Sequence, residues 1–315
     1  MNPIETNQLS WLGRHWAVRD LDLTVPAGCV LALLGANGAG KSTTLKMLVN
    51  RCEPTEGSAR VLGIDSRKLR EREKAQIGYV AEDQHMPTWM TVEQLIAYCR
   101  PFYPTWDRAL ETALTDQFVL PLGRKIGELS RGMRMKTALL TSLAYRPRLL
   151  LLDEPFSGLD ALVREELIRG IIDVAATGEC TVVVSSHDID EVERLADRVA
   201  LLENGRLRLH DTTEALLARF RRVEVLLDHE PDAAAEVELP PSWLEVERAG
   251  RAVRFVESEH EPASTGLLCQ THFPGGQVKS QPLSLREIFK VLERGRREAI
   301  KRRANSGVTV GAAIA

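Results

Sequence analysis

Hydrophobic residues along this chain follow two spacings, and stretches of the two kinds alternate. Short runs that are apolar throughout, such as Val30–Leu34 and Leu149–Leu152, predict strands buried on both faces. Ala161–Ala175 has apolar residues three or four positions apart, which predicts a helix. Alternating strands and helices indicate an α/β fold with a mostly parallel sheet. Further strands are expected at Ser58–Leu62, Ile77–Val80, Thr181–Val184 and Val199–Leu202, and a further helix at Asp190–Ala196.

Two early segments depart from this alternation. Ala17–Val25 alternates apolar and polar residues, which predicts a half-exposed strand, and we expect an antiparallel β subdomain beside the parallel sheet. From about residue 84 to 146 the pattern is helical, with helices predicted over Val92–Tyr98 and Trp106–Phe118. Thr91 is the expected cap of the first of these helices. The sequence therefore predicts a helical insert within the sheet domain.

The pattern changes again near Arg219–Arg222. The predicted elements beyond it are a strand at Val223–Leu227, a hairpin at Trp243–Glu247 and Ala252–Val256, a short helix near Leu267 and a basic amphipathic helix over about Ser284–Arg303. The basic charges either contact anionic lipid or a partner, or belong to a solvated helix end. We expect a first domain over 1–220, a small α+β accessory domain over 221–303 and a disordered tail over 304–315.

Composition narrows the class of protein only modestly. The chain is 44% hydrophobic and 27% charged, with a formal net charge of −3, so no basic character favours nucleic acid and no nucleic-acid partner is expected. The five cysteines have neither metal-ligand nor disulfide spacing, which fits a reducing cytosol. No apolar run approaches the roughly 18 residues of a membrane helix, so another chain must supply any membrane span.

The strand Val30–Leu34 leads into Gly35-Ala-Asn-Gly-Ala-Gly-Lys41-Ser42-Thr43, which fits the phosphate-loop pattern GxxxxGK[ST]. Glycines let backbone N–H groups converge on one small space, and the following helix adds its positive end. Lys41 adds a full charge, and Ser42 offers a hydroxyl to Mg²⁺. A strand before and a helix after argue against a chance glycine-rich turn. The residues expected to bind a nucleoside triphosphate are Gly35, Asn37, Gly38, Ala39, Gly40, Lys41, Ser42 and Thr43.

Two other buried strands end in side chains suited to phosphate chemistry. Asp153 and Glu154 follow Leu149–Leu152, where Asp153 would lie next to the Mg²⁺ held by Ser42. Glu154 is placed to act as a general base on an attacking water. His187 follows the strand at Thr181–Val184 and could hydrogen-bond the γ-phosphate or orient the water. The alternatives are surface acids and a structural histidine, and the phosphate loop makes both less favourable.

A second predicted helix, like the one after the phosphate loop, has an N-terminus suited to bind an anion. Ser130 is the expected N-cap of a helix that runs to about Tyr145, and Gly132 allows close approach. One chain holds only one triphosphate for two such helix ends, so this end is expected to face nucleotide bound to another copy. Asp160, on the turn Ser157–Asp160, either fixes neighbouring backbone or reaches across that interface.

In order and approximate spacing these motifs resemble the nucleotide-binding domain of ABC transporters, over about residues 5–220. The resemblance implies a P-loop NTPase core and ATP hydrolysis, with two ATP molecules between two copies in a homodimer or closely related heterodimer. It implies that Lys41 and Ser42 hold phosphate and Mg²⁺, that Asp153 supports the metal and that Glu154 is the general base. It further implies that His187 senses the γ-phosphate, that Ser130 and Gly132 contact the other copy's ATP, and that Asp160 crosses the interface.

The resemblance also implies a partner and a location. Loops at Pro87–Val92 and Arg100–Trp106 are similar to those of ATP-binding subunits that pair with a separate, ABC-2-like transmembrane permease. The same loops could merely cap the helical insert. With such a permease the protein would lie on the inner face of the cell membrane as a peripheral subunit, and closing on ATP would drive transport, with export favoured.

Three positions depart from the family pattern. Glu82 stands where the family usually has glutamine, and we expect it to serve as a third Mg²⁺ ligand and coupling contact. The signature segment reads Leu-Ser-Arg-Gly-Met, with Arg131 and Met133 in place of glycine and glutamine. Trp11 is the aromatic residue favoured to stack on adenine, with Trp16 as the alternative.

Two other function classes remain at this point. A soluble ABC-type ATPase acting on DNA or ribosomes would ordinarily carry a long coiled coil or a second nucleotide domain, and the sequence contains neither pattern. An ATP-sensing regulator whose accessory domain binds a ligand is compatible with the residues. A G protein would need an Asn-Lys-x-Asp motif, which is lacking, and that class leaves the signature segment unexplained.

Overall fold

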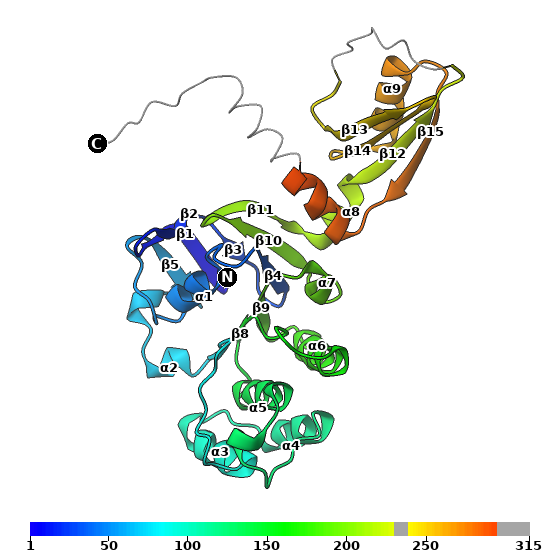
Figure 1. Cartoon of the computed structure of the whole chain (residues 1–315). Helices are drawn as coiled ribbons and strands as arrows, with labels where there is room; N and C mark the ends of the chain where they lie inside the picture. Colours follow the sequence, from blue (N-terminus) through cyan, green and yellow to red (C-terminus); the bar gives the residue numbers. More distant parts are fainter. Residues whose placement is uncertain (230–238, 295–315) are drawn as a thin grey trace. The chain divides into compact units, whose positions relative to one another are not determined.

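A six-stranded sheet in the order β11-β10-β4-β9-β8-β7 is the centre of the first unit, Met1–Thr212 (Figure 1). The computed structural model describes residues 1–229 and 239–294. All neighbouring strands are parallel except β11, which is antiparallel to β10, so the predicted mostly parallel sheet is confirmed. The strands are β4 (Val30–Leu34), β7 (Ile77–Val80), β8 (Leu149–Asp153), β9 (Thr181–Ser186), β10 (Arg198–Glu203) and β11 (Arg206–Thr212).

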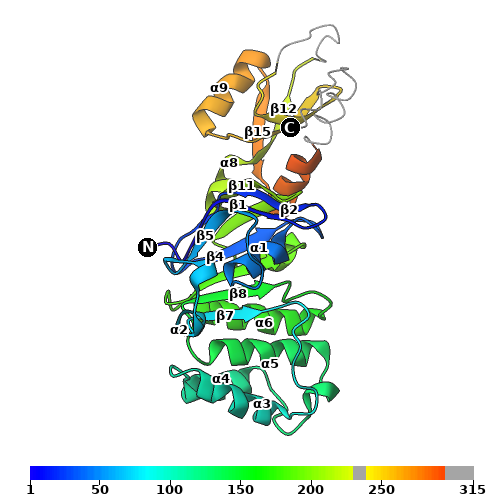
Figure 2. The same ribbon diagram turned by 90° about the vertical axis from the view of Figure 1, so that its left-hand side faces the viewer.

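Helices pack on both faces of this sheet because its strands are apolar throughout. Alternate residues such as Leu31, Leu149 and Leu151 enter a core shared with helix α1 (Lys41–Leu48). Helices α5 (Arg131–Leu143) and α6 (Ala161–Ala175) contact β7 and β9. Both views place α1 and α6 on either side of β8 (Figures 1 and 2). The ends of the strands are thus held between helix layers.

An antiparallel sheet lies against α1, as predicted. It has the order β2-β1-β5-β6, and β3 also pairs with β1. The predicted strand Ala17–Val25 is divided into β2 and β3, and β1 was missed. The register of β1 shifts between Asn7 and Ser10, which breaks the period-two pattern that marks a strand. The strands are β1 (Ile4–Leu12), β2 (Trp16–Leu21), β3 (Thr24–Val25), β5 (Glu56–Val61) and β6 (Ile64–Asp65).

The helical insert follows β7, and its first helix has the expected cap. Thr91 accepts a hydrogen bond from the backbone N–H of Gln94, and the Gln94 side chain accepts one from Thr91 N–H. The Asp107 carboxylate caps the next helix by accepting from the backbone N–H groups of Ala109 and Leu110. Helix α7 is shorter than its predicted range Asp190–Ala196. The helices are α2 (Glu71–Lys74), α3 (Val92–Cys99), α4 (Arg108–Gln117) and α7 (Ile189–Val192).

The second unit begins at Thr213 and contains a four-stranded antiparallel sheet in the order β13-β14-β12-β15. Trp243, Phe255 and Phe273 stack in its core. A helix over 285–294 is described, whereas the rest of the predicted basic helix and the predicted tail lie outside the described residues. The elements are α8 (Thr213–Arg219), β12 (Arg221–Leu226), β13 (Trp243–Ala249), β14 (Ala252–Glu257), α9 (Pro262–His272) and β15 (Gln277–Pro282). No helix within 1–229 or 239–294 is long and apolar enough to cross a bilayer.

Candidate functional site

The candidate site forms where β4, β8 and β9 end side by side. Leu34 pairs in register with Ser186, and Asp153 pairs with Ser185. The residues that follow each strand therefore emerge at one edge of the sheet, which is the usual ligand-binding edge of an open parallel sheet. The phosphate loop, the acidic pair and the histidine predicted from sequence are all attached here.

The phosphate loop leads directly from β4 into α1. Gly40 is its last residue and has φ +105°, and a Cβ there would lie 2.3 Å from the carbonyl oxygen of Ala17. Only glycine fits this position. The Lys41 side chain, which is 5% exposed, folds back over the loop and donates from Nζ to the carbonyl oxygens of Gly35 and Ala36, at 2.6 and 3.3 Å. The loop thus has the tight turn and the inward lysine that phosphate binding requires.

Asp153 connects the phosphate loop to β9. Its Oδ1 accepts hydrogen bonds from Ser42 Oγ at 2.9 Å and from Ser185 Oγ at 2.8 Å. Ser185 Oγ also accepts a hydrogen bond from the Glu154 backbone N–H at 2.9 Å. The predicted Ser42–Asp153 proximity is therefore present in the structure, and Ser185 fixes the backbone that presents Glu154.

Glu154 lies between a cation and an imidazole. Its Oε1 is 3.0 Å from Lys41 Nζ as an ion pair, although no described residue donates a well-aligned hydrogen bond to that oxygen. Its Oε2 is 2.8 Å from His187 Nδ1. Glu154 is 5% exposed and has φ +48°, a backbone conformation unusual for a long side chain. A buried ion pair contributes little net stability, so this strained, charged arrangement points to function.

A second layer of residues supports the end of β9, and sequence reasoning did not single these residues out. Ser186 Oγ donates to Glu191 Oε2 at 2.8 Å, and Glu191 is also 3.4 Å from the guanidinium of Arg164. Burial raises the pKa of Glu191 above its ordinary value, while Ser186 and Arg164 oppose the shift. The only sequence signal was the pair of serines directly before His187. These contacts join β9, α7 and α6 next to the histidine.

The signature segment and the Asp160 turn have clear structural roles within one chain. Ser130 caps α5 by accepting from Met133 N–H at 3.2 Å, as predicted. Asp160 caps α6 by accepting from Val163 N–H at 2.9 Å. Gly132 is buried, and a Cβ on it would lie 2.7 Å from Val163 Cγ1, so this glycine lets α5 and α6 approach. Contacts of Ser130, Gly132 and Asp160 with a second copy stay predictions.

Glu82 has a different neighbour from the one expected. Its Oε1 lies 3.8 Å from Arg131 Nη2, across a cleft of about 450 Å³ between the loop after β7 and helix α5. Gln84 is occupied in fixing that loop, because its Oε1 accepts from Ala81 N–H at 3.1 Å. The role of Glu82 as a Mg²⁺ ligand stays a prediction. The cleft is lined by Glu82, Asp83, Gln84, His85, Met86, Arg131, Arg134, Met135 and Ala138.

Comparison with known proteins decides the family. Residues 18–157 match the family described as ABC transporter, and residues 122–193 also match an AAA domain. The chain is 36% identical over 231 residues to the daunorubicin/doxorubicin resistance ATP-binding protein DrrA of Streptomyces peucetius, covering 70% of this chain and 69% of that protein. This chain belongs to the ATP-binding proteins of ABC transporters.

Two further curated relatives carry similar names. The ABC transporter ATP-binding protein YtrB of Bacillus subtilis is 28% identical over 232 residues, which are 73% of this chain and 79% of YtrB. The Nod factor export ATP-binding protein I of Burkholderia orbicola is 31% identical over 285 residues, which are 88% of this chain and 92% of that protein.

A solved ATP-binding subunit of an ABC transporter has the same fold. It superposes with a TM-score of 0.62 at 28% identity and covers 68% of this chain and 91% of its own. The predicted P-loop NTPase fold is confirmed, and this ABC protein is an ATPase. The candidate ATPase site is the cluster formed by Lys41, Ser42, Asp153, Glu154 and His187.

The donor set around Ser42 fits Mg²⁺. A serine hydroxyl and an aspartate oxygen lie within 2.9 Å of each other at the end of the phosphate loop. Over 1–229 and 239–294, no group of three or more His, Cys, Asp and Glu side chains could hold a metal ion without the substrate. Mg²⁺ is usually bound through one or two carboxylates together with substrate phosphates, so Ser42 and Asp153 are the residues that would hold it.

Trp11 lies in β1 and packs partly against the core beside α1, with its ring over Gly13. Its stacking on adenine is a prediction that a substitution can test. Trp11→Ala should weaken binding of ATP by about 5- to 100-fold, because stacking on an aromatic ring contributes about 1–3 kcal/mol per base. The measurement is titration with a fluorescent ATP analogue.

Trp16→Ala is the matched control for this prediction, since Trp16 lies in the neighbouring strand with Arg19 over its ring. Its nucleotide affinity should stay near that of the parent. If Trp16→Ala weakens binding and Trp11→Ala does not, the assignment belongs to Trp16. Thermal unfolding of both variants separates lost stacking from lost packing.

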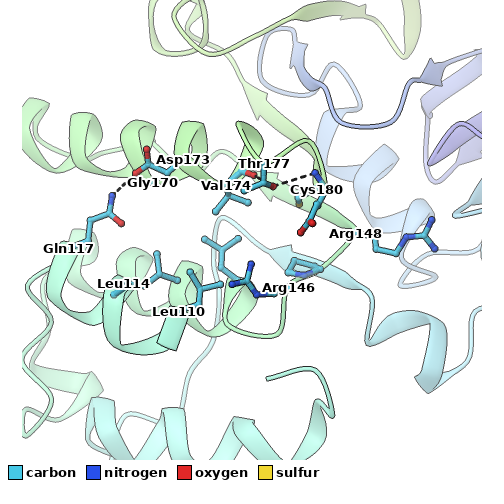
Figure 3. Close-up of a pocket in the computed structure, with 14 residues that line it drawn as sticks. Leu110, Leu114, Gln117, Arg146, Arg148, Gly170, Asp173, Val174, Thr177 and Cys180 are labelled. Carbon is cyan, nitrogen blue, oxygen red and sulfur yellow. Dashed lines mark hydrogen bonds between the residues drawn. The ribbon is translucent and has the colours of Figure 1, made fainter. Parts of the chain in front are cut away.

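An apolar cleft lies elsewhere in the ATPase unit (Figure 3). It has a volume of about 500 Å³ and lies between α4 of the helical insert and α6. Leu110 and Leu114 face Val174 across it, and Gln117 donates to Asp173 at one end, at 2.9 Å. The residues predicted to bind ATP are not among those lining this cleft. It marks the seam between the insert and the core.

Proposed function

We propose that this ABC ATPase powers an exporter made of several chains, in which two ATP-binding subunits close on ATP and move a separate membrane permease. The observation that carries the proposal is the length of the match to the Nod factor export protein. The match covers 285 residues, whereas the first unit ends at Thr212, so it includes part of the second unit. DrrA, whose name denotes drug resistance, supports the same direction of transport.

The site supplies the groups needed for ATP hydrolysis. Lys41 is bonded to the loop carbonyls and to Glu154, and it exchanges these partners for the terminal phosphates when ATP enters. Glu154 then loses its cation and can accept a proton from the attacking water. His187 holds the other carboxylate oxygen and keeps it oriented. Mg²⁺, held by Ser42 and Asp153, would offset the negative charge of the phosphates.

The second copy completes the site in this proposal. The start of α5 presents Ser130 and the positive end of a 13-residue helix, and both residues at that tip, Ser130 and Arg131, are exposed. A head-to-tail pair of subunits brings this tip to the triphosphate on the facing phosphate loop. The protein would then work on the inner face of the membrane, bound to its permease.

Purification from membranes tests the transport role. The full chain, tagged and produced in the cell that makes it, should be recovered from detergent-solubilised membranes together with a protein that has several membrane spans. The Lys41→Ala variant should copurify equally, because attachment to a permease does not depend on its phosphate loop. Recovery only from the soluble fraction would instead favour a soluble ATPase or an ATP-sensing regulator.

A further inference from the structure

Arg131 lies at a position where its positive charge does not stabilise its own helix. It is the first residue of α5, and the first turn of that helix has no acidic residue. A cation at a helix N-terminus opposes the helix dipole, which favours negative charge there. The structure therefore concentrates positive charge at this tip.

The guanidinium lies at the meeting point of three segments. Arg131 Nη2 is 3.8 Å from Glu82 Oε1 on the loop after β7. Its Nη1 is 3.2 Å from the point where a Cβ on Gly158 would stand, so the bare glycine of the Ser157–Asp160 turn leaves room for it. Glu82 and Arg131, which both depart from the family pattern, thus form an ion pair with each other.

This ion pair is weak enough to open. The side chains of Arg131 and Glu82 are 50% and 48% exposed, and such pairs gain little because water and salt screen them. A phosphate group is a stronger partner, because the planar fork of a guanidinium matches phosphate oxygens with two charge-assisted hydrogen bonds. Glu82 therefore keeps the guanidinium near the tip, and the guanidinium can leave Glu82 for a phosphate.

The distance from Arg131 to a phosphate on the facing copy follows from the position of its neighbour, Ser130. The Cα atoms of Ser130 and Arg131 are about 3.8 Å apart, as in any trans peptide. A terminal phosphate that contacts Ser130 is consequently within reach of the long, exposed Arg131 side chain. No change in the fold of α5 is required.

We propose that Arg131 donates hydrogen bonds to the terminal phosphate of ATP bound by the other copy, and that Glu82 holds it in its own subunit until the two copies close. The inference rests on the proposed closing of a dimer on ATP. It adds a residue to that site, because the glycine usual at position 131 has no side chain to offer.

The test is ATP-driven dimerisation of the Glu154→Gln protein, which binds ATP but hydrolyses it slowly. Light scattering gives the ATP concentration at which half of the protein is dimeric. Adding Arg131→Met should raise that concentration about 10- to 100-fold, the range for losing a hydrogen bond to a charged group. Arg131→Lys should fall between, since lysine keeps the charge but not the fork.

Arg134→Met is the matched control. Arg134 lies one turn further along α5, lines the same cleft and donates from Nε to Leu129 O. Its loss removes the same charge and should leave the ATP dependence unchanged. ATP affinity of the monomer, measured at protein concentrations below dimerisation, should be the same with Arg131→Met as without it. Equal weakening of the monomer would overturn action across the interface.

Glu82→Gln tests the holding role in the same background. It should lower the ATP concentration for half dimerisation by about two- to fivefold, the value of an exposed ion pair. The effect should vanish when Arg131 is already methionine. An equal effect with and without Arg131 would show that the two side chains act independently.

The experiment distinguishes failure of the proposed dimer closing from failure of the proposed role of Arg131. If the Glu154→Gln parent stays monomeric at saturating ATP, closing of a dimer is wrong and the role of Arg131 falls with it. If the parent dimerises and Arg131→Met dimerises at the same ATP concentration, only the role of Arg131 is wrong. An unchanged melting temperature for Arg131→Met excludes misfolding as the cause of a shift.

Discussion

Replacing Glu154 with glutamine should slow ATP hydrolysis by about 10²–10⁴-fold, the range for losing a general base. The amide has the same shape as the carboxylate but cannot take a proton from water. ATP binding should be kept or strengthened, because Lys41 is no longer paired with a competing carboxylate 3.0 Å away. Phosphate release measures turnover, and a fluorescent ATP analogue measures binding.

Glu257→Gln is a suitable control for this variant. Glu257 is also buried, at 1% exposure, but it lies in the second unit and accepts a hydrogen bond from Trp243 Nε1 at 2.8 Å. Its substitution removes a buried carboxylate without touching the phosphate loop, so turnover should be unaffected. Near-normal turnover of Glu154→Gln would instead show that another group activates the water.

Replacing Lys41 with alanine should weaken ATP binding on the order of 100-fold, because charge-assisted hydrogen bonds contribute about 1.5–3 kcal/mol each. Lys41 is the cation that the phosphate loop directs over its own carbonyls, and nothing else in the loop carries a charge. Calorimetric titration with ATP measures the loss. Lys46→Ala, on the exposed side of the same helix, should bind ATP normally.

The same substitution leaves Glu154 buried without its cation, so reduced stability could be mistaken for reduced binding. The comparison is therefore repeated with Glu154→Gln already present, because the double variant leaves no buried carboxylate without its cation. An ATP affinity that falls at least as much in the Glu154→Gln background as in the parent assigns the loss to the phosphate contact. Unchanged affinity in the second background would rule out Lys41 as a phosphate ligand.

Sequence patterns predicted the core of this fold well where burial is complete. Val30–Leu34, Ile77–Val80 and Ala161–Ala175 begin and end as expected, because continuous or helical apolar spacing leaves few alternatives. The exposed edge strand β15 was missed. β15 is exposed along its whole length, so no side-chain alternation records its pairing with β12. Its register is determined by the partner strand instead.

The site residues likewise divide into those that the sequence predicted and those that it did not. Ser42 and Asp153 were expected to lie close together because the carboxyl ends of parallel strands meet at one edge of the sheet. The serines 185 and 186 were missed because hydroxyl groups within a strand give no periodic signal, and their partners are 31 and five residues away. The Glu82–Arg131 contact depends on a loop and a helix tip, and only coordinates relate them.

The packing of Gly132 against Val163 has a mechanical consequence. Because the side chain of Val163 packs directly against Gly132, the tip carrying Ser130 and the start of α6, which Asp160 caps, are held in contact. The segment from Glu154 to Asp160 joins β8 to α6, and Phe156, which is fully buried, anchors this segment. A change in the state of the Glu154 carboxylate would thus reach the start of α5 through a segment of only a few residues.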